Sequence, residues 1–306
     1  MLGYVLKRLL QLIPMLFILT VIVFSIVRLI PGDPAAMLLG AEVSKEALEY
    51  ERERMGLNQP LTVQYSKYML DLLQGNLGVS LNTRKPVLTE IANRYPATFI
   101  LAIGGTIVAS LIGILVGIIA AINHNKLFDN LLMSASVIFV SMPSFFLALV
   151  LMLMFSLHFR LFPSIGLSTP RHAVLPVLTL GLHAVGFIAR TTRSAMLDVI
   201  HQDYIRTSRS RGIPINVITY SHALKNSLVP VVTAIGLRFG SLLAGATLVE
   251  TVFSVPGIGR FLVDSVGNRD YPAIQGSILV LATTFVVVNT LVDIIYAIVD
   301  PRVKLD

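Results

Sequence analysis

Long uncharged apolar runs are the feature that most constrains how this sequence folds. A transmembrane helix needs about 20 largely apolar residues, and six runs reach or approach that length. The spans predicted from them cover residues 9–28, 97–122, 131–157, 173–190, 228–249 and 276–299. The third run is too long for one straight span, and we expect Pro143 to break its start. The pattern predicts an all-α integral membrane protein with six transmembrane helices.

The composition agrees with a membrane protein. Of the 306 residues, 55% are hydrophobic and 13% are charged, whereas a soluble domain is roughly 25% charged. This deficit excludes disordered and nucleic-acid-binding proteins and argues against a soluble enzyme. The first run is longer than the roughly 7–15 residues of a signal-peptide core and lacks an A-x-A-like cleavage site. We therefore expect residues 9–28 to form a retained helix.

The positions of the basic residues predict the orientation, because Lys and Arg gather in short cytoplasmic loops. With the N-terminus inside, eleven basic residues flank the spans on the inner side and four lie in the short outer loops. Both termini are then cytoplasmic, residues 31–96 form a small extracytoplasmic subdomain, and residues 190–227 form a cytoplasmic loop. Within the outer segment, residues 44–55 are expected to form a helix capped by Ser44 and ended by Gly56.

Motifs for catalysis or nucleotide binding are missing from the sequence. It has no G-x-x-x-x-G-K-[ST], no H-E-x-x-H, no G-x-S-x-G and no Cys, so it offers no P-loop, zinc-protease motif or nucleophile elbow. The Gly257-Ile-Gly259 pair lacks the third glycine of a dinucleotide fingerprint, and Pro256 favours a structural turn there. We predict that the chain is not an enzyme, holds no cofactor or metal and draws its energy from another subunit.

The cytoplasmic loop predicts a helix, a turn and a second helix. The first covers Asp198–Arg211, Gly212 suits its left-handed C-terminal cap, and Pro214 begins the second helix. Four residues of that helix share one apolar stripe: Val217, Ile218, Ala223 and Leu224. Two interpretations stay open, a solvated basic loop or a docking element for a cytoplasmic partner that covers the stripe.

Several segments resemble the permease subunits of ABC importers, most closely the dipeptide/oligopeptide/nickel group. They include DYIRTSRSRG at Asp203–Gly212, HALKNSLVPVVT at His222–Thr233, ETVFSVPGIG at Glu250–Gly259, NRDYP at Asn268–Pro272 and LVDIIYAIVDPR at Leu291–Arg302. The resemblance covers nearly the whole chain. Within the group, the sequence is most similar to the dipeptide and glutathione permeases. Arg206, Thr207 and Ser208 replace the Glu-Ala-Ala of the general importer motif, and Pro230 falls late, as in this subgroup.

The resemblance implies a machine with several subunits. These are a second, related permease (making a heterodimer), two ATP-binding subunits that hold ATP and Mg, and an extracytoplasmic substrate-binding protein. The chain would supply half of a pathway for di/oligopeptides or glutathione-like peptides in a bacterial inner membrane and work by alternating access. Its ATPase-coupling loop would use Asp203, Arg206, Thr207, Arg209, Gly212, Pro214, Ile218 and His222. The alternatives are a permease for chelated nickel or an autonomous secondary transporter, although inverted repeats and paired carboxylates are not visible.

Polar residues within the spans are candidates for the translocation pathway, since such residues are rare in membranes. These candidates are Arg238 in the fifth span and Asn289 and Asp293 in the sixth. Arg238 has three open interpretations: contact with a substrate carboxylate, a structural pair with Asp293 or another polar group, or an interface with a second permease. His183 is expected to be a hydrogen-bonded packing residue and not a metal ligand.

Overall fold

The computed structural model describes residues 2–29, 33–39, 44–214 and 217–299. In these residues the chain is helical, and its one β-type contact is an isolated bridge between Val79 and Pro86. In chain order the helices are α1 (Leu2–Leu29), α2 (Pro34–Leu39), α3 (Lys45–Arg54), α4 (Leu61–Leu73), α5 (Val87–Ile122), α6 (Leu127–Ser141), α7 (Ser144–Leu151), α8 (Pro170–Ile200), α9 (Asp203–Ser210), α11 (Leu224–Val252), α12 (Ile258–Gly267) and α13 (Tyr271–Val299). Two π-helical stretches, Met152–His158 and Ile218–Ala223, extend α7 and lead into α11.

The all-α membrane class predicted from the sequence is confirmed. Five helical segments are long and apolar enough to cross a membrane: Leu6–Arg28, Val87–Ile122, Pro170–Ile200, Ile218–Val252 and Tyr271–Ile294. A sixth span results if α6 and the extended α7 are counted together. Several helices are longer than the apolar runs that predicted them, because polar turns at their ends continue the helix beyond the uncharged stretch.

The third predicted run, 131–157, is not one helix. α6 ends at Ser141, Met142 is extended, and α7 begins after Pro143, so the two halves meet at an angle of 105°. Pro143 lacks the amide hydrogen that would continue the helix, which is the physical reason for the break. The break was predicted, but it falls in the middle of the run and not at its start.

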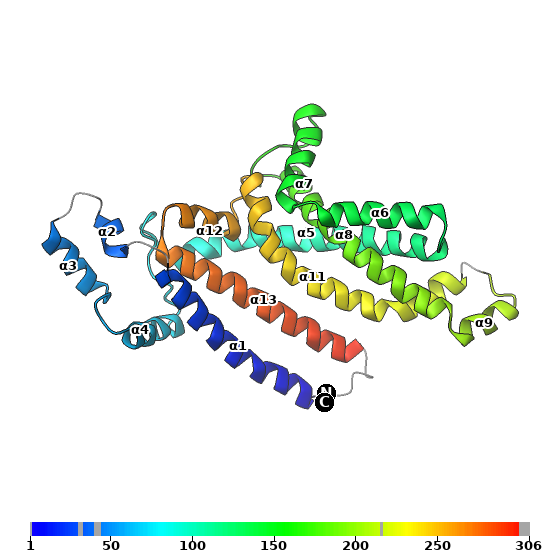
Figure 1. The fold of residues 1–306 in the computed structure, drawn as a ribbon, viewed down its shortest axis with the longest axis horizontal. Coiled ribbons are helices and arrows are strands. Elements are labelled where there is room, and N and C mark those ends of the chain that lie inside the picture. The colour runs from blue at the N-terminus through cyan, green and yellow to red at the C-terminus, as the bar shows by residue number, and fades with distance from the viewer. Residues whose placement is uncertain (1, 30–32, 40–43, 215–216, 300–306) are drawn as a thin grey trace.

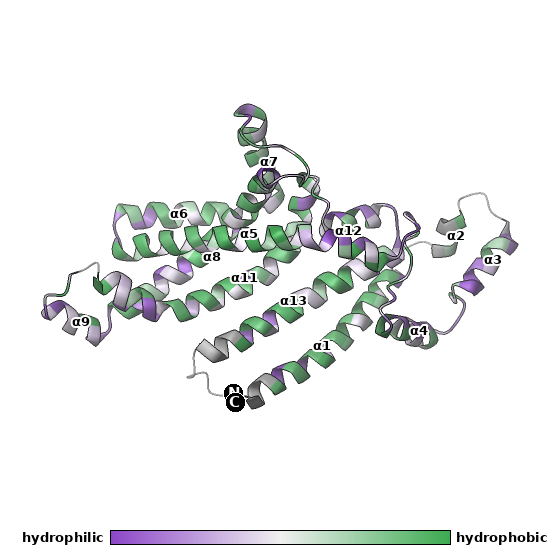
Figure 2. Ribbon diagram, turned by 180° about the vertical axis from the view of Figure 1, so that it is seen from behind, coloured by the Kyte–Doolittle hydropathy of each residue, from purple (hydrophilic) through white to green (hydrophobic). Residues whose placement is uncertain are grey.

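Figure 1 shows how the long helices are arranged. α5 packs along α8, α6 lies beside α8, and α1 lies beside α13. α11 contacts α5, α8 and α13 and so connects these parts. The small helices α2, α3 and α4 lie at one end of the molecule and α9 lies at the opposite end. In Figure 2 the long helices are largely hydrophobic, whereas α3 and parts of α9 carry hydrophilic residues.

The contact between α5 and α8 depends on small residues. A Cβ atom at Gly113 would lie 2.8 Å from the side chain of Ile188, and one at Gly117 would lie 2.7 Å from the Ala189 carbonyl oxygen. The Gly113-x-x-x-Gly117 pattern therefore marks a real close approach of two backbones, as this pattern indicates in membranes. The core around it is apolar and includes fully buried Leu101, Leu175, Leu180 and Ile188.

The segment between α1 and α5 packs α4 against α1. The Tyr65 hydroxyl lies 2.8 Å from the Thr20 hydroxyl, and its ring meets Phe24 edge to face, with the ring centroids 5.2 Å apart. Ahead of α4, the Ser44 hydroxyl accepts a hydrogen bond from the Ala47 amide and Gly56 has a φ of +70°, so the predicted cap and helix end are confirmed. A hydrogen bond from its own backbone amide, and a second one from the Ser44 side chain, lower the pKa of the Glu46 carboxyl.

Replacing Gly117 with Ala is expected to loosen the α5–α8 contact. The new methyl group would clash with the Ala189 carbonyl and Thr192, and overpacking of this kind costs about 1–3 kcal/mol. The thermal unfolding midpoint of the purified chain should fall. Gly245→Ala is the matched control, because nothing lies within 4 Å of a Cβ at that helical position. Equal midpoints for the two variants would contradict the assigned contact.

Candidate functional site

The segment predicted to couple to a partner begins at the end of α8, which extends to Ile200. We expected one helix over residues 198–211, and this prediction is wrong because the chain turns at His201 and Gln202. The His201 amide and ring Nδ1 both lie within hydrogen-bond distance of the Leu197 carbonyl, at 3.3 and 2.7 Å, which ends α8. α9 then begins as a separate helix at Asp203, beyond the end of α8 (Figure 1).

The predicted cap at Gly212 is confirmed. Gly212 has a φ of +73°, and its amide donates to the Arg209 carbonyl at 3.0 Å. This left-handed conformation carries no steric penalty for glycine. Pro214 follows, and its carbonyl accepts from the amides of Val217 and Ile218. Pro214, the expected first residue of the second helix, is described, whereas the next two residues, Ile215 and Asn216, lie outside the described residues.

The apolar stripe of the second helix is covered by the chain itself. Ala223 packs with Met196 and Val199 of α8 and Ile118 of α5, and Ile218 is 1% exposed. A partner is therefore not needed to cover this stripe, since the ends of α8 and α5 already do so, and the docking interpretation must be argued from the exposed residues. Of the four stripe residues, only Val217 is well exposed. Ile218, predicted to be part of the coupling loop, lies in the core and supports the loop from inside.

α9 is anchored at two points and otherwise exposed. Ile205 is fully buried, and the Tyr204 hydroxyl accepts a hydrogen bond from Asn226 Nδ2 at 2.8 Å. The remaining predicted coupling residues of this loop are exposed, except for a partly buried His222: Asp203, Arg206, Thr207, Arg209, Gly212 and Pro214. Asp203 and Arg206 are 3.8 Å apart with side chains 98% and 74% exposed, so the pair is of little energetic importance. The geometry presents a fixed, mainly basic surface.

A buried ion pair near this end of the molecule was not predicted. Asp129 of α6 is 1% exposed and accepts two hydrogen bonds from Arg193 of α8, at 2.7 and 2.6 Å. The Asn125 amide also donates to Asp129, and His124 lies 2.9 Å from Arg193. Bidentate pairing fixes orientation as well as distance, so this cluster holds the α5–α6 turn against α8. In the sequence Arg193 is one of many inner basic residues, and nothing there pairs it with Asp129.

The three predicted pathway residues do not meet. Asp293 pairs with Arg8 of α1 at 3.2 Å, so Asp293 is not the partner of Arg238. The Arg238 guanidinium carbon instead lies 4.1 Å from the centroid of the Phe187 ring, a cation–π contact between α11 and α8. Within the described residues Arg238 has no carboxylate within ion-pair distance. Asn289 faces Gly240 of α11, and its Oδ1 is buried without a described partner.

His183 also lies inside a span, in α8. We expected it to be hydrogen-bonded, but its buried Nδ1 has no hydrogen-bond partner in the part of the chain that the structure describes. A group of three or more potential metal-binding side chains is likewise missing from the described residues. The ring is therefore one of the few polar groups, together with Arg238 and Asn289, left without full polar contacts inside the bundle.

A buried carboxylate joins three helices at the end opposite α9. Glu250 of α11 is fully buried, and its Oε1 accepts from the Thr98 hydroxyl of α5 at 2.6 Å. Its Oε2 accepts from the Arg260 amide of α12 at 3.0 Å, while the Thr98 hydroxyl oxygen accepts from the Ile258 amide at 2.9 Å. A Cβ at Gly257 would collide with the carboxylate. The chain turns ahead of Gly257, as Pro256 predicted, but Ile258 and Gly259 already belong to the first turn of α12. The role of Glu250 was missed.

A second buried carboxylate acts at the start of α13. Asp270 is 1% exposed; its Oδ2 accepts from the Ser80 hydroxyl at 2.5 Å and from the Asn82 amide at 3.2 Å. Its Oδ1 accepts from the Ala273 amide in the first turn of α13, at 3.3 Å. The carboxylate thus caps α13 and attaches the loop before α5 to it. An acidic residue just before an apolar helix is the sequence signal for the cap.

These features define a polytopic membrane subunit with a fixed basic surface at one end and buried polar attachments at the other. Family comparison identifies its type. Residues 113–305 match the family described as "Binding-protein-dependent transport system inner membrane component", and residues 1–102 match the N-terminal family of such components. The chain belongs to this family of ABC importer permeases. It is therefore a multi-pass inner-membrane transport subunit that works with ATPase and substrate-binding partners.

Relatives and solved structures agree with this family. The chain is 44% identical to a dipeptide transport system permease protein DppB of Alkalihalophilus pseudofirmus, covering 99% of this chain and 100% of that protein. It is 44% identical to the glutathione transport system permease protein GsiC of Salmonella typhimurium, covering 99% of both. Inward-facing structures of the MetNI methionine ABC transporter share the fold, with a TM-score of 0.60, 20% identity and coverage of 69% of this chain and 96% of that chain.

Replacing Thr98 with Val is expected to loosen α12. The change removes the donor to Glu250 and the acceptor of the Ile258 amide, and a buried polar group left unpaired costs about 1–3 kcal/mol. Amide hydrogen exchange should become faster at Ile258 and Arg260. Thr106→Val is the control, since Thr106 bonds only to the Ala102 carbonyl of its own helix. Unchanged exchange in Thr98→Val would show that the attachment is not needed.

Proposed function

We propose that this chain is the transmembrane subunit of an ATP-driven importer of short peptides, either di/oligopeptides or glutathione-like peptides. The observation that carries the peptide assignment is the 44% identity, over nearly the whole chain, to proteins named as dipeptide and glutathione permeases. The likeness extends through the outer segment as well as the spans. Alternating access between inward-open and outward-open states would move the substrate across the membrane.

The complete transporter would contain four further subunits. These are a second, related permease that forms the other half of the pathway, two ATP-binding subunits and an extracytoplasmic substrate-binding protein. ATP and Mg would bind to the ATPase subunits, since this sequence lacks a P-loop motif. A heterodimer of permeases is consistent with a chain whose pathway candidates, Arg238 and Asn289, lack full partners within the described residues.

The α9 end of the molecule is proposed to face the cytoplasm. It carries Arg206, Arg209 and Arg211 close together on an exposed surface, as expected for a short inner loop. The buried side chains of Ile205 and Ile218 hold this surface in place. A fixed surface transmits movement of an ATPase better than a solvated loop would, because less of the movement is lost in local rearrangement.

Arg238 is proposed to face the pathway and attract the carboxylate of a peptide. An arginine within a span is costly unless it meets an anion, a polar group or water. Here it rests on the Phe187 ring and is only partly buried, so its guanidinium keeps free donors. The alternative of a structural pair with Asp293 is not favoured, because Asp293 bonds to Arg8.

Chelated nickel, the alternative substrate, is not favoured by the relatives at 44% identity, which are named for dipeptide and glutathione transport. An autonomous secondary transporter is not favoured either, because the chain belongs to a binding-protein-dependent family. Reconstitution separates the latter possibility from the proposal. Uptake by this chain alone, without an ATPase, would contradict it.

Reversing two charges on α9 is expected to uncouple the transporter. The variant Arg206→Glu with Arg209→Glu changes exposed side chains, so the permease itself should fold normally. Like charges placed at a complementary interface cost several kcal/mol, and a loss of about tenfold in ATP-driven uptake requires only about 1.4 kcal/mol. Lys126→Glu is the control, an exposed charge reversal outside α9 near the α5–α6 turn. Normal uptake and normal ATPase capture by the α9 variant would contradict the docking surface.

Replacing Arg238 with Gln is expected to lower uptake at limiting substrate by about tenfold. A hydrogen bond to a charged group contributes about 1.5–3 kcal/mol, and Arg238→Lys should restore part of it. The amount of permease in the membrane should not change. Arg171→Gln, an exposed arginine at the start of α8, serves as the control. If uptake by Arg238→Gln equals that of wild type, Arg238 does not contact the substrate.

A further inference from the structure

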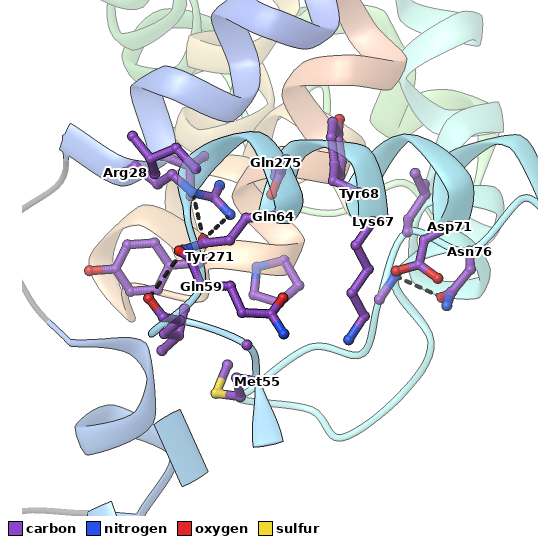
Figure 3. A pocket seen from close by; sticks show the side chains of 17 residues that line it. Arg28, Met55, Gln59, Gln64, Lys67, Tyr68, Asp71, Asn76, Tyr271 and Gln275 are labelled. Atoms are coloured by element: carbon purple, nitrogen blue, oxygen red, sulfur yellow. Dashed lines mark hydrogen bonds between the residues drawn. The ribbon is translucent and has the colours of Figure 1, made fainter. Parts of the chain in front are cut away.

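The outer end of the molecule contains a cavity that the transport cycle described above does not use. It has a volume of about 560 Å³ and lies between the end of α1, the α3–α4 connection, α4 and the start of α13. Pockets that hold small molecules have volumes of roughly 300–1,000 Å³. Arg238 and Asn289 do not line it, since they lie far along α11 and α13. Figure 3 shows the cavity and its labelled side chains.

The charges around this cavity are not paired with one another. Arg28 of α1 and Lys67 of α4 are its cations, and Asp71 of α4 is its anion. Within the described residues none of the three forms a salt bridge, although Lys67 and Asp71 are one helical turn apart. In Figure 3 Arg28 and Asp71 lie toward opposite sides of the cavity. A ligand with one negative and one positive end would complement this arrangement.

Uncharged hydrogen-bonding groups fill the space between the charges. Gln59, Gln64, Asn76 and Gln275 supply four side-chain amides to the lining. Gln64 is already held in place, because its Oε1 accepts from Arg28 at 3.1 and 2.9 Å and its Nε2 donates to the Gln59 carbonyl at 2.8 Å. Amide side chains offer both donors and acceptors, which is what the peptide group of a ligand requires.

Three buried polar atoms of the lining lack a hydrogen bond of normal geometry in the described structure, although the Gln275 side chain lies close enough to Tyr68 to act on its phenol. They are the hydroxyl oxygens of Tyr68 and Tyr271 and the Nε2 of Gln275. Tyr271 is only 5% exposed, so its hydroxyl has little access to bulk water. Burial raises the pKa of the Tyr68 phenol, which keeps it a neutral donor. Buried polar groups are nearly always hydrogen-bonded in native proteins, so these groups, beside the charges and amides of the lining, favour a polar ligand over an apolar one.

We propose that this cavity is a binding site for the free termini of a short peptide on the extracytoplasmic side of the permease. The ammonium group would meet Asp71, the carboxylate would meet Lys67 and Arg28, and the peptide group would bond to the amide side chains. An extended dipeptide is about 7 Å long and fits a cavity of about 560 Å³. The inference rests on the proposed function, since it takes peptides as the substrate, and adds a site to it.

The test measures binding of labelled alanylalanine to the purified transporter in lipid nanodiscs, without the substrate-binding protein. Lys67→Gln is expected to weaken binding of the free dipeptide about tenfold and to have no effect on its C-terminal amide. Asp71→Asn is expected to weaken binding about tenfold and to have no effect on the N-acetylated dipeptide. Both factors correspond to about 1.4 kcal/mol. In the proposed orientation, Lys67→Gln responds only to a free C-terminus and Asp71→Asn only to a free N-terminus.

Two control variants accompany the test. Lys45→Gln and Asp264→Asn remove the same charges from exposed positions outside the cavity, and both should bind the dipeptide like wild type. Lys67 is exposed and Asp71 is partly exposed, so their variants should keep the wild-type unfolding midpoint. Equal binding of the dipeptide by all four variants would overturn the proposal.

Two other results would also overturn it. Capture of the substrate-binding protein could fall in the Lys67 and Asp71 variants while dipeptide binding stays normal, which would make the cavity a protein-docking surface. Alternatively, the variants could change only the response to anionic phospholipid in the nanodisc, which would make it a lipid site. Uptake of alanylalanine by the complete wild-type transporter is measured separately. Failure of that uptake alone would refute the peptide-import function, whereas failure of the binding pattern alone would refute only this site.

Discussion

The close contact between α5 and α8 determines how the other helices can pack. Between membrane helices the hydrophobic effect supplies little attraction, because lipid is as apolar as the side chains. Van der Waals contact between closely spaced backbones must supply the attraction instead. Gly113 and Gly117 permit this contact because they place no Cβ between the two helices. α11 then packs against both α5 and α8, and α13 and α1 are added on the far side of α11. A larger residue at either glycine would clash with α8.

Buried carboxylates join neighbouring helices and loops at both ends of this bundle. Asp129 bonds to Arg193 near the α9 end, whereas Glu250 and Asp270 hold backbone amides and hydroxyls at the opposite end. Each lies where a helix meets a loop, and each satisfies polar groups that would otherwise be buried without partners. Among the described residues, Arg238, Asn289 and His183 differ from these carboxylates, because none of the three has a full set of polar partners inside the bundle.

Much of the fold could be predicted, because a membrane span leaves a simple signal in sequence. Runs free of charge located the long helices, Pro143 located the break, and a glycine marked the cap at Gly212. The contacts between polar side chains of different helices could not be predicted in the same way. Asp129 with Arg193, Glu250 with Thr98 and Asp293 with Arg8 join residues far apart in sequence, and only the packing of helices selects among the possible partners. The stripe beginning at Val217 was misjudged for the same reason.

The cavity beside α4 could not be predicted from the sequence either. Its lining comes from four separate segments, so no single stretch of sequence has the pattern of a binding site. Arg28 was read as the polar flank of a span, and Lys67 and Asp71 fell within an outer segment of mixed charge. They share one cavity because Tyr65 and Gln64 hold α4 against α1.

The helix from Ile218 to Val252 is continuous and connects the two ends of the molecule. Its π-helical first turns pass directly into α11, so no loop separates the surface near α9 from the buried Glu250 at the far end. At the α-helical rise of 1.5 Å per residue, 35 residues correspond to about 50 Å of helix, with Pro230 inside it. The surface near α9 and the buried Glu250, which is bonded to α5 and α12, are thus carried by one continuous helix.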